Sequence, residues 1–146
     1  MTIEKLSDKK IDDIDKKTDY IICNLPDFYI KRFKLTYPST MIFFYGTRLK
    51  HAKRHKDEFT SEDEFYETLI NLDAFISNPD YVGIHPTNGS IQIVKRTSQL
   101  TLVAVQFEDK RNRLEFKTMF PITESKLERY LDSGNWLDLS ASVWYS

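Results

Sequence analysis

The sequence predicts a single α+β domain in which helices pack on an antiparallel meander sheet. A chain of 146 residues has the usual length of one domain, and its composition does not shift partway along. Its 40% hydrophobic residues, among them ten Phe, eight Tyr and two Trp, can fill one core. Strand-length runs separated by turn residues follow an amphipathic helix, which is the pattern of an α+β protein.

The first part of the chain predicts three strands after a polar segment. Residues 1–18 scatter isolated apolar residues among charges, which favours a surface helix or a tether over a core element. Three runs that follow are rich in aromatic and β-branched residues, and Pro26 and Pro38 separate them. These candidate strands are residues 20–25, 28–36 and 41–45.

Two helices are expected next. Leu49 and Ala52 recur at helical spacing and predict a short helix within residues 48–56. Ser61 and Glu64 have the spacing of a capping box, in which the Ser side chain accepts from a free amide and the Glu side chain reaches back. The second helix carries one apolar stripe and ends at Asn78-Pro79; the stripe is Phe65, Leu69, Leu72 and Ile76.

The remaining chain predicts a meander and a last helix. Its four strands, joined by polar turns, are residues 81–85, 90–96, 100–108 and 113–120. Thr123 can cap a helix that reaches Leu131, and Ser133-Gly134 supplies a left-handed end. Residues 132–146 are apolar enough to dock as a tail.

Several features limit the classes of function. The opening residues lack the apolar run of a secretory signal, no stretch is long enough to span a bilayer, and Cys23 is the only cysteine. We therefore expect a cytoplasmic protein without membrane association. The chain has no glycine-rich phosphate loop and no nucleophile-elbow pattern, so we expect no cofactor. Its formal net charge of −1 predicts that any anion site is local.

One local charge separation stands out. Residues 48–56 contain five Lys or Arg and no acid, whereas residues 57–67 contain six acids and no base. His51 and His55 within the basic segment are four residues apart, so they share one face of a helix. The same cations would repel a metal ion, and we expect no metal here.

Cations that bind phosphate beside histidines that move protons are the groups that metal-independent RNA cleavage requires. A solvated helix face whose histidines merely pack or cap remains the alternative interpretation of this segment. His85, where a strand meets a turn, is either a site residue or a turn residue. Lys95 and Thr118 are candidates for the same cleft, although regular alternation groups Thr118 with Leu114 and Phe116, which makes half-burial equally compatible.

The order of these features resembles that of phage-encoded barnase/EndoU/colicin/RelE-like (BECR-type) nuclease domains, over roughly residues 20–131. The resemblance rests on three short motifs: Lys50-His51-x-x-x-His55, Asn78-Pro79-Asp80-Tyr81-Val82, and Lys95 with the strand end Lys117-Thr118-Met-Phe-Pro121. It implies a BECR ribonuclease-like fold and metal-independent RNA cleavage. Carried over by position, its site residues are Lys50, His51, His55, Lys95 and Thr118; His85 is added from its turn position alone.

The sequence therefore leads to two hypotheses of different classes. In the first, the chain is a metal-independent, toxin-like or phage-associated ribonuclease domain. Its catalytic residues are His51, His55, His85, Lys50 and Thr118, and its substrate-binding residues are Arg48, Arg54 and Lys95. In the second, it is a noncatalytic phage-type interaction protein that binds a host protein or nucleic acid through its acidic face or aromatic strands. The expected partners are RNA and a host or inhibitor protein.

Overall fold

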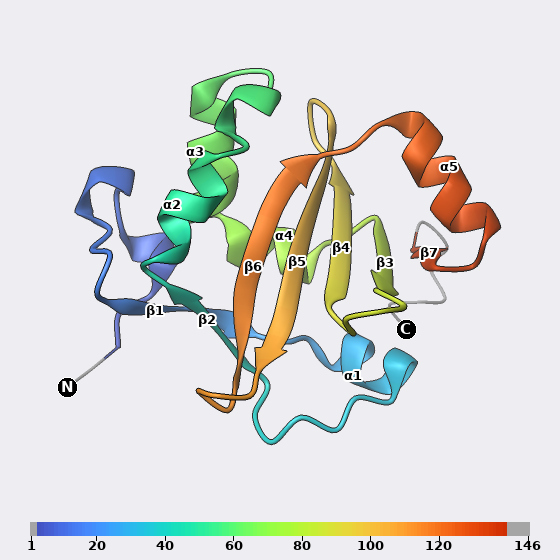
Figure 1. The fold of residues 1–146 in the computed structure, drawn as a ribbon, viewed down its shortest axis with the longest axis horizontal. Helices are drawn as coiled ribbons and strands as arrows, with labels where there is room; N and C mark the ends of the chain where they lie inside the picture. The colour runs from blue at the N-terminus through green and yellow to red at the C-terminus, as the bar shows by residue number, and fades with distance from the viewer. Residues whose placement is uncertain (1–2, 140–146) are drawn as a thin grey trace.

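A computed structural model describes residues 3–139, which form one mixed sheet with helices on both faces (Figure 1). Within those residues the sheet has seven strands in the order β1-β2-β6-β5-β4-β3-β7, and all neighbouring pairs are antiparallel except β2 and β6. The strands are β1 (Asp19–Asn24), β2 (Met41–Tyr45), β3 (Tyr81–Ile84), β4 (Ile91–Arg96), β5 (Leu100–Glu108), β6 (Arg113–Pro121) and β7 (Trp136–Asp138). The predicted α+β class and the β3 to β6 meander are confirmed.

The helices lie on different faces of this sheet. They are α1 (Asp27–Phe33), α2 (Arg48–Lys53), α3 (Glu62–Ile70), α4 (Leu72–Ser77) and α5 (Glu124–Asp132), with 3-10 turns η1 (Leu6–Asp8), η2 (Ile11–Asp13) and η3 (Lys56–Glu58). Among the described residues, no helix is long and apolar enough to cross a membrane.

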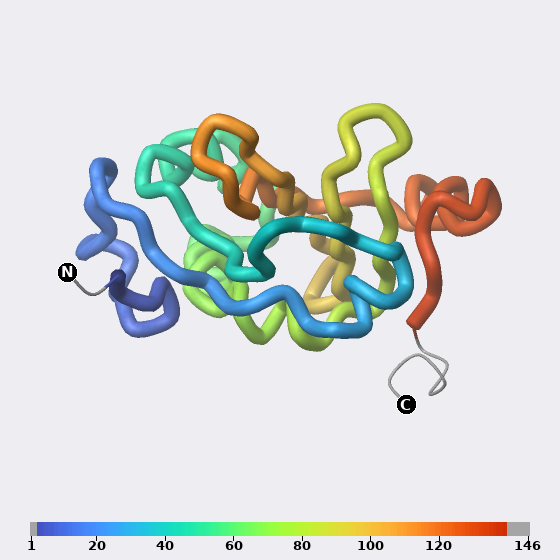
Figure 2. The backbone as a smooth tube through the Cα atoms, turned by 90° about the horizontal axis from the view of Figure 1, so that it is seen from below, coloured from blue at the N-terminus to red at the C-terminus, as the bar shows by residue number. Residues whose placement is uncertain are grey.

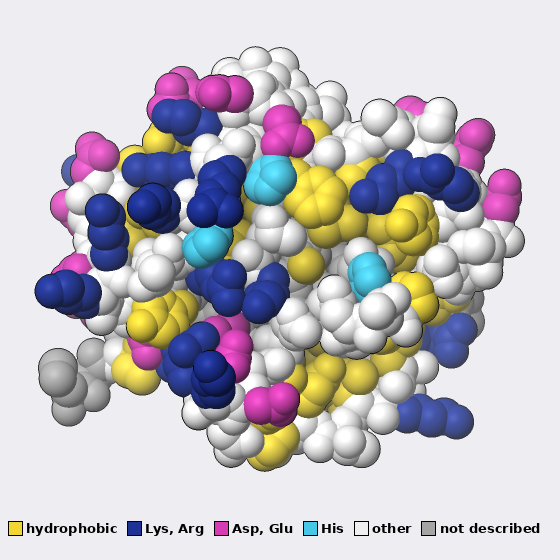
Figure 3. Space-filling view, viewed as in Figure 1, with side chains coloured by type: hydrophobic (Ala, Val, Ile, Leu, Met, Phe, Trp, Pro, Cys, Tyr) yellow, Lys and Arg dark blue, Asp and Glu magenta, His cyan; other side chains and the backbone are white. Residues whose placement is uncertain are grey.

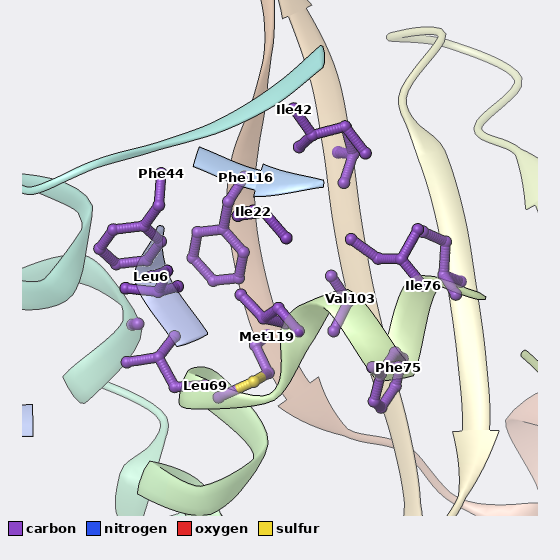
Figure 4. Close-up of a cluster of buried hydrophobic side chains, with 14 of the residues drawn as sticks. Leu6, Ile22, Ile42, Phe44, Leu69, Phe75, Ile76, Val103, Phe116 and Met119 are labelled. Atoms are coloured by element: carbon purple, nitrogen blue, oxygen red, sulfur yellow. The ribbon is translucent and has the colours of Figure 1, made fainter. Parts of the chain in front are cut away.

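The main core lies between the sheet and the pair α3 and α4. Ile42, Phe44, Val103, Phe116 and Met119 point from the strands toward these helices (Figure 4). A smaller cluster forms on the opposite face, where strand residues that alternate with these pack against α5; its buried members are Val94, Leu100, Leu102, Ala104, Leu127 and Trp136. We call the two sides the α3/α4 face and the α5 face. Figure 2 shows the β3–β4 and β5–β6 turns projecting away from α3 and α4, so they border the α5 face.

The predicted strand at residues 28–36 is wrong, because this segment forms α1. Tyr29 is fully buried and its hydroxyl donates to the Ile76 carbonyl at 2.7 Å, a contact that only the folded chain supplies. Asp27 lies in the first turn and Lys31 in the last turn, which suits the helix dipole. Long-range burial thus overrides the β propensity of the aromatic residues.

Two other expectations need correction. The N-terminal segment is packed rather than a tether, since Leu6 is only 1% exposed and belongs to the main core. The helix expected to begin at Ser61 and end at Asn78-Pro79 is divided at Asn71, whose side chain donates to the Glu67 carbonyl at 2.8 Å at the end of α3. Its apolar stripe nevertheless faces the core throughout.

The expected caps are present in part. The Ser61 side chain accepts from the Glu64 amide at 3.1 Å, but the Glu64 carboxylate bonds to Ser98 instead of reaching back. Thr123 caps α5 by accepting from the Lys126 amide at 3.1 Å, and Gly134 has a left-handed φ of 81°. At the C-terminal end β7 pairs with β3, and the rest of the expected docking tail, residues 140–146, lies outside the described residues.

Candidate active site

Helix α2 packs on the core through only two buried side chains, and its basic side faces solvent. Leu49 and Ala52 are buried in the main core, while Lys50 and His51 are exposed. This amphipathic spacing is what the sequence shows at Leu49 and Ala52, so the short helix is confirmed. Arg48 and Arg54, two of the residues expected to bind phosphate, therefore stand on this helix segment beside β6.

The His51 imidazole has a pKa below its ordinary value. Desolvation is the largest cause, and the charges of Arg54, Arg48, Lys50 and Lys117 act in the same direction. Lys117 belongs to β6, so its influence identifies a second element that brings positive charge to His51. The ring is consequently held neutral at a pH where an unperturbed histidine begins to gain a proton.

The cations around His51 are not neutralised by carboxylates. Among the described residues, ion pairs form elsewhere, and none includes Arg48, Lys50, Arg54 or Lys117. Figure 3 shows Lys and Arg side chains gathered around histidine on this surface. Uncompensated positive charge beside a neutral histidine favours binding of an anion at this place.

Arg113 at the start of β6 and Arg111 in the turn before it both bind a buried carboxylate. Glu115 is 0% exposed and accepts from Arg111 (Nε–Oε2 2.6 Å, Nη2–Oε1 2.9 Å) and from Arg113 (Nε–Oε2 2.6 Å), while Arg113 Nη1 also donates to Asp19 at 2.8 Å. Burial raises the pKa of Glu115, but the hydrogen bonds from Arg111 and Arg113 outweigh it and lower the pKa overall. This group is therefore a structural ion cluster.

His55 is oriented by two contacts. Its Nδ1 forms a hydrogen-bonded ion pair with Glu58, three residues ahead. Its ring lies against Phe120 of β6, with ring centroids 5.4 Å apart and planes tilted by 40°. Because Nδ1 is bonded to Glu58, Nε2 is the nitrogen left for a substrate. His55 lies beyond the end of α2, directly before η3, so the expectation that it shares one helix face with His51 is wrong. The Phe120 contact joins this segment to the end of β6.

A bulge in β6 decides where Thr118 lies. Thr118 pairs with Ala104 whereas Phe116 pairs with the next residue, Val105, so Lys117 is the additional residue. Regular alternation would put Thr118 on the same face as the buried Phe116. The bulge reverses this phase, and half-buried Thr118 lies with Ala104 on the α5 face.

His85 is on the α5 face but apart from the other two histidines. Its strand is separated from β6 by β4 and β5, which at about 4.8 Å per strand puts it roughly 14 Å away. Its Nδ1 accepts from the amides of Thr87 (3.1 Å) and Asn88 (3.2 Å). These bonds hold the β3–β4 turn in shape, as the turn interpretation of His85 requires.

Lys95 lies on the other side of the sheet. Its neighbours Val94 and Arg96 face α5, and its Nζ donates to the Asn78 carbonyl at 2.5 Å. It lines a hollow of about 540 Å³ with residues of α3 and α4. The structure thus gathers Arg48, Lys50 and Arg54 around His51 beside β6, the strand that carries Thr118 and contacts His55. Lys95 and His85 lie elsewhere on the sheet.

We call the place where α2 and residues 54–58 meet β6 the α2–β6 junction. Three of its residues were not predicted as site residues, although two of them lie within the strand-end motif that begins at Lys117: Lys117, Glu58 and Phe120. Glu58 follows His55 by three residues, a spacing that indicates contact on a helix and was available as a signal. Lys117 and Phe120 reach the site only through the pairing of β6, which no local pattern reveals. Within residues 3–139 there is no group of three or more His, Cys, Asp or Glu that could hold a metal ion.

The chain is similar to a known protein family. A family model described as phage-Barnase-EndoU-ColicinE5/D-RelE like nuclease 3 matches residues 21–129, from β1 into α5. No curated protein and no solved structure matches the chain. The matched range contains the complete α2–β6 junction.

Proposed function

The chain belongs to the phage-Barnase-EndoU-ColicinE5/D-RelE like nuclease 3 family, and from this premise we propose that it cleaves RNA without a metal ion at the α2–β6 junction. The observation that carries the proposal is the neutral His51 among four unpaired cations: Arg48, Lys50, Arg54 and Lys117. A nuclease needs a phosphate site and groups that transfer protons, and this junction offers both.

His51 is the general base of the proposed reaction. A base has to be unprotonated before it can accept a proton, and the lowered pKa of His51 keeps it so at neutral pH. The charges that lower this pKa also attract the phosphodiester, so a single arrangement of cations serves both needs. An exposed histidine without these cations nearby would not attract the phosphodiester.

His55 is the general acid. Glu58 bonds Nδ1 and Phe120 supports the ring, which leaves Nε2 to donate a proton. His85 would be the other candidate, but its Nδ1 is occupied by two turn amides and its strand is three positions away from β6. Lys95 has no part in this proposal, because it lies on the α3/α4 face.

The proposed reaction is a transesterification in which side chains transfer the protons. His51 removes the proton of the ribose 2′-hydroxyl, and the 2′-oxygen attacks phosphorus as the bond from phosphorus to the 5′-oxygen breaks. His55 gives its proton to the departing 5′-oxygen. Lys50, Arg54 and Lys117 stabilise the charge that develops on the phosphoryl oxygens, and Thr118 donates a hydrogen bond to one of them. The products are a 2′,3′-cyclic phosphate and a 5′-hydroxyl.

The test is incubation of the purified chain with total RNA in EDTA, followed by analysis of the new ends. We expect fragments that end in 2′,3′-cyclic phosphate, and a loss of at least about 100-fold in rate for His51→Ala, since one general base contributes on that order. Lys53→Gln serves as the matched control, because Lys53 is on the same helix but is not among the charges acting on His51. Intact RNA under all conditions would overturn the proposal.

A second candidate function is supported by a different surface. The hollow beside Lys95 is lined by Glu64 and Glu67 of the acidic helix, and Glu64 Oε2 is buried without a hydrogen-bond partner. These carboxylates suit a basic group from a host or inhibitor protein. Binding of such a protein that is abolished in Glu64→Gln and Glu67→Gln, with RNA left intact by the wild-type chain, would favour this function over cleavage.

A further inference from the structure

Phe120 occupies a position between the two helices that border the α5 face. Its ring contacts His55, which follows α2, and the Lys126 ammonium of α5 lies 5.2 Å from the ring centroid. The side chain is only partly buried. Figure 3 shows apolar surface on this face between histidine and a further group of Lys and Arg side chains.

Helix α5 carries cations that have no carboxylate partner. Lys126 also lies 5.7 Å from the Tyr130 ring and Arg129 lies 5.9 Å from it, and neither forms an ion pair within residues 3–139. By contrast, Glu124 at the start of α5 is paired with Arg96. The unpaired cations therefore stand over aromatic rings, with their charge available to an anion.

The aromatic part of this surface is rigidly supported. Tyr130 stacks on buried Trp136, with centroids 4.5 Å apart and planes 16° apart. Trp136 of β7 is itself held, because its Nε1 donates to Gln92 Oε1 of β4 at 2.8 Å. Phe120 is held by its pairing with Leu102. These rings are already ordered before a ligand binds. Little binding free energy is therefore spent on ordering them.

We propose that Phe120 with Lys126 and Arg129 forms a subsite for single-stranded RNA, next to the proposed cleavage site on which this inference rests. A nucleobase adjacent to the scissile phosphate stacks on Phe120, and the following phosphate binds Lys126 and Arg129. Aromatic rings interleaved with cations bind single strands in this manner, because every base has a face that can stack.

The subsite determines the form of the substrate. A base can reach Phe120 only when it is unpaired and unstacked, so the surface selects single strands, loops or bulges over duplex RNA. Contacts to a ring face and to phosphate carry little base identity. The structure therefore points to a preference for strand form and a weak preference for sequence.

Binding of an RNA that cannot be cleaved tests the subsite separately from catalysis. A fluorescent 2′-O-methyl octanucleotide lacks the attacking hydroxyl, and its affinity is measured by anisotropy, alone and annealed to its complement. Phe120→Leu keeps apolar volume but removes the ring, and we expect it to weaken single-strand binding at least about fivefold. Phe120→Trp, which keeps a ring, should stay within about twofold of the wild type.

The cations are tested by their salt dependence. Lys126→Gln combined with Arg129→Gln should lower the slope of log affinity against log salt by about 0.7 for each phosphate that the variant no longer neutralises. Lys31→Gln, an exposed change on α1, should leave the slope unchanged. Thermal melting of each variant verifies that it is folded.

Equal affinities of the wild type and Phe120→Leu, or equal affinity for single strand and duplex, would overturn the subsite, even if the wild type cleaves RNA. The patch would then suit a protein partner. Conversely, a wild type that binds the octanucleotide through Phe120 but cuts no RNA in EDTA would support the subsite and refute the proposed function. The two failures are thus distinguishable.

Discussion

At His51, desolvation and the neighbouring cations act on one titration in the same direction. Both disfavour the protonated ring, so the pKa falls below its ordinary value of about 6.5. Between the lowered pKa and about 6.5 the unfolded chain binds a proton that the folded chain does not, so this residue contributes stability that is lost as the pH falls through that window. Above this pH window the His51 ring is neutral and can accept a proton.

The titration of His51 should therefore respond to its neighbours. Lys50→Gln removes one of the cations that oppose protonation, and we expect the pKa of His51 to rise, followed by NMR titration of its ring Cε1 proton. The acidic limb of kcat/KM against pH should move upward with it, because this limb reports the proposed base. Lys53→Gln should move neither. An unchanged pKa in Lys50→Gln would contradict the electrostatic explanation.

At the level of elements, the candidate site exists because three short elements meet. Helix α2 presents its basic side, η3 contributes Glu58, and the bulged end of β6 contributes Lys117 and Thr118. The bulge is the decisive irregularity, since one additional residue turns Thr118 to the α5 face. No one of these three elements contains all the residues of the candidate site.

The contact between His55 and Glu58 predicts a positioning role for Glu58. Glu58→Gln keeps the shape but removes the charged acceptor that holds Nδ1–H, and we expect kcat to fall about tenfold with little change in KM. The dependence of kcat on pH should also change in this variant. Glu62→Gln is the matched control, because Glu62 pairs with Lys56 by a 3.4 Å contact and does not touch His55.

If Glu58→Gln only lowered the melting temperature and left kcat and the pH profile unchanged, the contact would be structural. Glu58→Asp adds a second measurement, since it restores a carboxylate on a shorter side chain. Partial recovery of kcat in this variant would identify the charge as the quantity that matters.

At the level of the whole molecule, the sheet separates two chemically different sides. Unpaired cations and histidines lie on the α5 face and its α2 border, whereas the acidic helix lines a hollow on the α3/α4 face. A net charge of −1 is thus compatible with a strongly positive local site. The proposed cleavage site and the hollow of the second candidate function therefore lie on opposite sides of the sheet.

The packing of β7 against β3 predicts a position sensitive to substitution that is separated from β6 by β4 and β5. A Cβ atom added at Gly83 would lie 2.1 Å from the Asn135 carbonyl oxygen and 2.5 Å from Trp136 Cδ1. Gly83→Ala should therefore displace β7 and destabilise the domain by at least about 2 kcal/mol, measured by urea unfolding. Gly89→Asn, in an open turn at φ 72°, should change stability far less. Equal unfolding midpoints would contradict this packing.

Local patterns determined much of this protein. Alternation and turn residues predicted the β3 to β6 meander, the spacing of Leu49 and Ala52 predicted α2, and Ser61 and Thr123 marked helix starts correctly. The amino-acid sequence also predicted the α+β class and the nuclease resemblance. These features depend on residues within a few positions of one another, so periodicity and capping chemistry are sufficient.

Only the tertiary structure decided which side chains meet. The burial of Tyr29 made residues 27–33 a helix, and the register of β6 against β5 turned Thr118 toward the α5 face. The pairing of β4 with β5 placed Lys95 on the opposite side, and β6 brought Lys117 to His51 and Phe120 to His55. Strand register and long-range burial depend on partners tens of residues away, and a one-residue shift exchanges the two faces of a strand.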